Sequence, residues 1–73
     1  MLKKIDARGM KCPRPIIELA LAQRMLAAAD EISIMSDDPA FENDVQAWCD
    51  ATNCELLEVR KQGTIISALI RIR

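Results

Sequence analysis

The sequence is organised around one stretch, Gly9-Met10-Lys11-Cys12-Pro13-Arg14-Pro15. Proline is well tolerated at the first position of a helix, because the amide hydrogen that it lacks would have no partner there. Pro13 is therefore predicted to be the first residue of a helix, with Cys12 at or next to its N-cap. Unpaired amides and the positive end of the helix dipole favour a thiolate at that position. The stretch thus predicts a reactive cysteine; the alternative is an inert cap.

The residues around the cysteine support the same prediction. Lys11 and Arg14 flank Cys12, and two neighbouring cations are expected to stabilise its thiolate. Gly9 is predicted to supply a backbone angle that other residues resist, in the loop that leads to Cys12.

An apolar run follows and predicts a helix over residues 13–28, because good helix formers fill it and no glycine interrupts it. Its apolar residues fall on two sides. One side holds Ile16, Leu19, Ala20 and Ala27, and the other holds Ile17, Leu21, Met25 and Ala28. Both sets cannot pack on one sheet, so either Leu21 and Met25 form an exposed apolar patch or the helix is buried more broadly than usual.

Alternation of apolar and polar residues predicts four strands, at 2–7, 31–36, 54–61 and 64–73. A turn at Gln62-Gly63 is expected to join the last two strands into a hairpin. The residues expected to face the core are Ile5, Ala7, Ile32, Ile34, Leu57, Val59, Ile66, Ala68, Ile70 and Ile72.

A second helix is predicted to begin at Asp38-Pro39, with Asp38 as its N-cap and Pro39 as its first residue. Its buried stripe is predicted to be Phe41, Val45, Trp48, Cys49 and Thr52. The element order is therefore β-α-β-α-β-β, in a single domain of residues 1–73. This order predicts an α/β (α+β) two-layer sandwich, with a four-stranded mixed sheet and both helices on one face.

Composition narrows the function. Ten basic and eleven acidic residues give a net charge of -1, and one Trp, one Phe and no Tyr offer no set of stacking platforms, so direct nucleic-acid binding is not expected. No run is long enough to span a membrane, and residues 1–10 lack the apolar segment of a signal peptide. A cytoplasmic protein without membrane contact is expected.

The three cysteines and the absence of histidine limit the chemistry further. A Cys-His nucleophile and a disulfide framework are disfavoured. No metal site is predicted, because Cys49 and Cys54 lack further ligands. Cys49 is expected to be a buried small hydrophobe, whereas the role and exposure of Cys54 stay open.

The position of Pro15 excludes one more kind of chemistry. Thiol-disulfide oxidoreductases place a second cysteine three positions after the first, and Pro15 occupies that position here. Without this resolving thiol, Cys12 is expected to attack a sulfane sulfur, hold it and pass it to another thiol.

Four stretches together resemble the TusA/SirA family of small sulfur-carrier proteins. They are Asp6-Ala7-Arg8-Gly9-Met10-Lys11-Cys12-Pro13-Arg14-Pro15, Asp37-Asp38-Pro39-Ala40, Ala47-Trp48-Cys49 and Ile70-Arg71-Ile72-Arg73. Three features depart from the usual pattern. Ala29-Asp30 stands where a Gly-Asp pair is common, Cys54 stands where His or another polar residue is frequent, and the first helix is more apolar than expected at Leu21 and Met25.

The resemblance implies a sulfur relay, with Cys12 as the catalytic residue and Pro13 and Pro15 shaping the site. The loop residue Gly9 is expected to shape the site as well, through its backbone angle. Cys12 would take persulfide sulfur from a donor protein, a cysteine desulfurase or a rhodanese-like protein. It would pass the sulfur to an acceptor protein, as in tRNA 2-thiouridine synthesis, sulfur oxidation or molybdenum-cofactor pathways. No cofactor is implied, and a monomer is expected.

One alternative belongs to a different class: a non-catalytic protein-interaction or regulatory module that binds a partner through Leu21 and Met25. An RNA-binding module is a third hypothesis, disfavoured by charge and by the missing aromatic residues.

Overall fold

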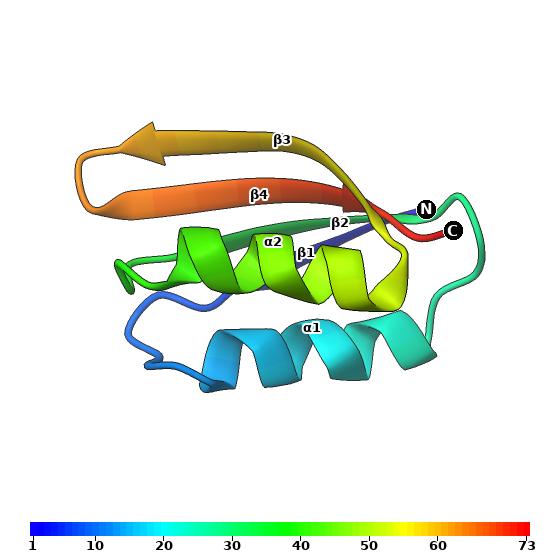
Figure 1. Cartoon of the computed structure of the whole chain (residues 1–73), viewed down its shortest axis with the longest axis horizontal. Coiled ribbons are helices and arrows are strands. Elements are labelled where there is room, and N and C mark those ends of the chain that lie inside the picture. Colours follow the sequence, from blue (N-terminus) through cyan, green and yellow to red (C-terminus); the bar gives the residue numbers. More distant parts are fainter.

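The computed structural model describes residues 1–73 and contains six elements. They are β1 (Leu2–Asp6), α1 (Arg14–Arg24), β2 (Glu31–Ser36), α2 (Phe41–Thr52), β3 (Glu55–Gln62) and β4 (Ile65–Arg71). Both helices lie on the same face of the sheet, and both termini lie at one end of the molecule (Figure 1). The predicted order and the two-layer architecture are confirmed. No helix is long and apolar enough to cross a membrane.

The sheet is mixed, with strand order β1-β2-β4-β3. β1 and β2 are parallel, with α1 in the connection between them, while β4 pairs antiparallel with both β2 and β3. Parallel neighbours need such a crossover, and antiparallel neighbours need only a hairpin. The β1–α1–β2 crossover and the β3–β4 hairpin follow this rule, whereas β2 and β4 are antiparallel neighbours separated in sequence by α2 and β3.

The core lies between the sheet and the helices. The central strands contribute Ile32, Ile34, Ile66, Ala68 and Ile70, all buried as their alternation predicted. The helices contribute the buried side chains of Leu19, Ala22, Phe41, Val45 and Cys49. The predicted stripe on α2 is confirmed for three of its residues, whereas Trp48 and Thr52 are only partly buried.

Helix α1 is shorter than predicted at both ends. Pro13 is its N-cap rather than its first residue, and the helix ends at Arg24, with Met25 as C-cap. The following turn is closed by Asp30, whose carboxylate accepts a hydrogen bond of 2.9 Å from the amide of Ala27. The chain has to reverse here to enter β2, so the apolar residues after Arg24 cannot continue the helix.

The predicted start of α2 is also wrong. The N-cap is Ala40, two residues after Asp38. Asp38 still supplies hydrogen-bond acceptors for two backbone amides near the start of the helix. Its carboxylate accepts a hydrogen bond of 3.0 Å from the amide of Ala40, and its carbonyl accepts one of 3.0 Å from the amide of Phe41. This turn precedes the helix and uses the side chain that the sequence assigned to the cap.

Two details of the β3–β4 hairpin differ from the prediction. The pairing shifts between Leu56 and Glu58, so a bulge at Leu57 reverses the alternation. Leu56 and Val59 therefore pack against the core, and the prediction that Leu57 faces inward is wrong. The turn lies at 63–64, one residue later than predicted, with Gly63 at a φ of 61°.

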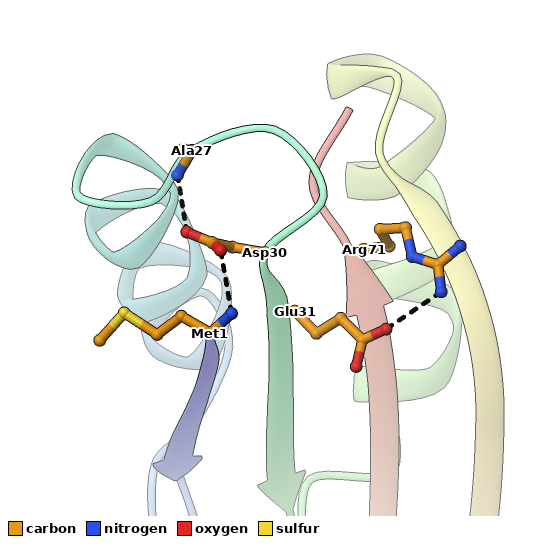
Figure 2. Close-up of polar contacts among 5 residues, drawn as sticks. All are labelled: Met1, Ala27, Asp30, Glu31 and Arg71. Atoms are coloured by element: carbon orange, nitrogen blue, oxygen red, sulfur yellow. Dashed lines mark hydrogen bonds and ion pairs between the residues drawn. The ribbon is translucent and has the colours of Figure 1, made fainter.

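Polar contacts tie together the end of the sheet that carries the termini (Figure 2). The Asp30 carboxylate accepts hydrogen bonds from the Met1 ammonium group, at 3.1 Å, and from the amide of Ala27. Beside it, Arg71 donates to Glu31 across the β2–β4 pair at 3.1 Å. The partners are partly accessible to water, which screens each ion pair and limits the stability that it adds.

Candidate functional site

Cys12 lies in the loop between β1 and α1, at the opposite end of the molecule from the termini (Figure 1). Its side chain is exposed, and its amide donates a hydrogen bond of 2.8 Å to the Asp38 carboxylate. The amide of Gly9 donates a similar bond of 3.0 Å to Asp37. The Asp37-Asp38 pair thus holds the Cys12 loop from the other side of the site.

The predicted role of Gly9 in the backbone is confirmed. Its φ of 85° lies in the left-handed region that residues with a Cβ adopt at a cost. The Cys12–Pro13 peptide bond is cis, and Pro15 is buried in the first turn of α1.

A shallow groove of about 350 Å³ opens beside the sulfur. It is lined by Cys12, Pro13, Ile16, Asp44, Ala47 and Trp48. The last three residues come from α2, at spacings that place them on one face of the helix. The sequence prediction named Trp48 as a core residue and as part of the Ala47-Trp48-Cys49 stretch, and it assigned neither Trp48 nor Asp44 to the site. The helical spacing of Asp44, Ala47 and Trp48 was visible, but their nearness to Cys12 depends on the packing of α1 against α2.

The electrostatics of the site reverse one prediction. The pKa of the Cys12 thiol is raised, chiefly by hydrogen bonding to the Asp44 carboxylate, then by burial, and then by the charges of Asp44 and Asp38. The sequence predicted a lowered pKa. The empty site therefore favours the neutral thiol over the thiolate.

The start of α1 explains why its amides do not stabilise a thiolate. Pro13 and Pro15 carry no amide hydrogen, and the amide of Arg14 already donates to the carbonyl of Lys11 at 2.8 Å. The two predicted cations act elsewhere. Arg14 pairs with Glu18 at 3.8 Å, and the charge of Lys11 helps to lower the pKa of Asp38 after two hydrogen bonds from backbone amides.

The other two cysteines lie in the core. Cys49 is 3% exposed, and burial raises its pKa to about 11. Cys54 is 8% exposed, and its sulfur accepts a hydrogen bond of 3.5 Å from the Gln23 amide. The structural role predicted for Cys49 agrees with this burial, and of the two orientations left open for Cys54 the inward one is observed.

The outer face of α1 carries an exposed apolar patch of Ile17, Leu21 and Met25. Their side chains are 46%, 52% and 86% exposed. This exposure decides between the two interpretations of α1 in favour of the patch.

The chain is similar to known proteins in sequence and in fold. The family model described as "Sulfurtransferase TusA" matches residues 3–72. A solved structure, the SirA-like protein from Desulfitobacterium hafniense, superposes with a TM-score of 0.84 at 25% sequence identity. That match covers 97% of this chain and 96% of the other. The chain belongs to the TusA family of sulfurtransferases.

Proposed function

We propose that the chain carries sulfur as a persulfide on Cys12, taking it from a donor protein and delivering it to an acceptor protein. The observation that carries this proposal is the contrast among the cysteines: Cys12 is exposed on a hydrogen-bonded loop, whereas Cys49 and Cys54 are buried. A carrier needs one sulfur that two different proteins can reach in turn. Only Cys12 meets that need in this chain.

Two features of the site support this transfer, the exposure of the sulfur and the groove beside it. The exposed sulfur can approach a persulfide held by another protein, and the apolar side of the groove can receive the chain around that persulfide. No second thiol is near enough in sequence to displace the cargo as a local disulfide. The donor class we propose is a cysteine desulfurase or a rhodanese-like protein, and the acceptor class includes tRNA-thiolation and sulfur-oxidation proteins.

A loading experiment tests the proposal. The protein is incubated with a cysteine desulfurase, its pyridoxal phosphate and cysteine, and the added sulfur is located by mass spectrometry of intact protein and peptides. We expect one sulfur atom, located on Cys12, and no loading of Cys12→Ser. Sulfur shared equally with Cys49 or Cys54, or acceptance by Cys12→Ser, would contradict the assignment.

The exposed patch on α1 favours a second candidate, an interaction module. Leu21→Glu together with Met25→Glu would then abolish the biological effect, while Cys12→Ala would leave it intact. The carrier proposal expects Cys12→Ala to abolish the effect. Growth of a deletion strain complemented with each variant separates the two candidates.

A further inference from the structure

Asp44 faces the reactive sulfur and has no role yet. It lies in the first turn of α2, and its carboxylate lines the same groove as Cys12, which comes from the loop before α1. No lysine, arginine or terminal ammonium group of the chain forms an ion pair with Asp44. Its negative charge is therefore not neutralised within the chain.

The rest of the lining strengthens the effect of that charge. Pro13, Ile16, Ala47 and Trp48 contribute apolar surface to the groove. Apolar side chains exclude water from one side of the groove, so the interaction between the carboxylate and the sulfur is less screened there than between two fully solvated groups, and the exposed side of the sulfur keeps its solvent screening.

The other charged groups around the sulfur do not cancel this effect. Asp38 acts on the thiol in the same direction as Asp44, from the loop before α2. Among the cations, Arg14 is paired with Glu18 on α1, and Lys11 acts on Asp38. The raised pKa of the Cys12 thiol agrees with this balance.

We propose that Asp44 sets the charge state of the Cys12 sulfur, holding the empty carrier as a neutral thiol and disfavouring the anionic persulfide, so that the cargo is held loosely. This inference rests on the carrier function proposed above and concerns how strongly the same site retains sulfur. Asp44 acts by its charge, from the lining of the groove that it shares with the atom that receives and releases the cargo.

Loading transfers a sulfane sulfur from the donor protein to the sulfur of Cys12. The Cys12 sulfur bonds to the sulfane sulfur of the donor, and the S–S bond of the donor breaks. Its electron pair stays on the donor sulfur, which takes up the proton lost by Cys12. The products are a Cys12 persulfide and a donor thiol, with no outside oxidant or reductant.

A persulfide is more acidic than a thiol, because the neighbouring sulfur atom stabilises the anion. At neutral pH the loaded carrier therefore bears a negative charge, whereas the empty carrier does not. The carboxylate of Asp44 repels the loaded form alone, and this difference shifts the equilibrium toward donation. Removing the charge should make the carrier retain sulfur more strongly.

The test compares Asp44→Asn with Asp50→Asn, an exposed carboxylate on α2 outside the groove. Each protein is equilibrated at neutral pH with glutathione persulfide and glutathione, and the persulfide fraction on Cys12 is measured by mass spectrometry. Asp44→Asn should raise the loading equilibrium constant, because the persulfide anion then loses a repelling neighbour. Asp50→Asn should match the wild type.

A second readout excludes a purely structural effect. The rate of Cys12 alkylation by iodoacetamide is measured against pH, and its midpoint should fall in Asp44→Asn and in Asp44→Ser but stay unchanged in Asp44→Glu, which keeps the charge. Loading or midpoints equal to the wild type in both uncharged variants would overturn the inference and leave the carrier function standing. A wild-type protein that accepts no sulfur would overturn the carrier function itself, and this inference with it.

Discussion

The amide of Cys12 donates a hydrogen bond of 2.8 Å to the carboxylate of Asp38, which lies 26 residues further along the chain. The other carboxylate oxygen of Asp38 accepts a bond of 3.0 Å from Ala40, just before α2. One side chain therefore fixes both the loop that carries the sulfur and the start of the helix that carries Asp44 and Trp48. The surroundings of the sulfur depend on this long-range contact.

Stability should fall in acid because three carboxylates titrate at lower pH in the folded chain. Hydrogen bonds from Arg8 lower the pKa of Asp6 to about 2. A hydrogen bond from the amide of Ala27 lowers the pKa of Asp30, and hydrogen bonds from the amides of Ala40 and Cys12 lower the pKa of Asp38. A carboxylate whose pKa is lower in the folded chain than in the unfolded chain stabilises the fold. This stabilisation is fully present above the unfolded pKa of about 4, and it is lost as the pH falls through the pKa of the folded chain.

We therefore expect the free energy of unfolding in urea to be nearly constant from about pH 7 to pH 5 and to decline between about pH 4 and pH 2. Urea titrations across this range, followed by circular dichroism, measure it. A free energy that rises on acidification below pH 4 would contradict the hydrogen-bond assignments.

Two leucines on α1 provide a matched test of the core. Leu19 is fully buried and Leu21 is 52% exposed, on the same helix. Leu19→Ala should lower the free energy of unfolding by about 2–5 kcal/mol, through lost burial and the cavity left behind. Leu21→Ala should change it by less than about 0.5 kcal/mol, as is usual for surface positions. Equal effects in urea unfolding would show that α1 packs on a different face.

Ala29 marks a site where a substitution should stabilise the chain. Its φ of 74° lies in the left-handed region, where the Cβ of alanine has a steric cost. Glycine adopts this conformation without that cost. Ala29→Gly should raise the free energy of unfolding by about 1 kcal/mol. This figure is the steric relief in the folded chain minus the extra conformational entropy that glycine gives the unfolded chain. Thermal unfolding measures the change, and a lower melting temperature would refute the expectation.

The cysteines should differ sharply in reactivity. In the native protein we expect a chromogenic disulfide reagent to modify one thiol, Cys12, because Cys49 and Cys54 are buried and burial raises the pKa of Cys49 to about 11. All three thiols should react in denaturant. Peptide mapping identifies the modified residue, and rapid native modification of Cys49 would contradict the packing of α2.

Local patterns in the sequence predicted most of the fold. Glu31–Ser36 is the strand expected from its alternation, and the buried face of β4 follows the same rule. The errors lie where tertiary structure overrides local preference. The bulge at Leu57 reverses an alternation that looked regular, and Asp38 uses its cap-forming side chain in a turn before α2.

The candidate site was predicted only in part. Cys12 and the special backbone of Gly9 could be identified locally, because a cysteine before two prolines and a glycine in a loop are visible in sequence. The direction in which the pKa of the Cys12 thiol is shifted could not be predicted from the sequence. It depends on Asp38 and Asp44, which approach Cys12 only when α2 packs beside α1. Neighbours in sequence suggested a cationic site, and neighbours in space make it anionic.

A sulfur carrier must both receive sulfur on Cys12 and release it. The most direct measurement loads the protein with radioactive sulfur from labelled cysteine through a desulfurase, removes the donor, and then adds an excess of acceptor thiol. We predict that the label is bound to Cys12 before the chase and passes to the acceptor during it, leaving an unmodified protein. Label that never binds Cys12, or that stays on the protein through the chase, would contradict the claim.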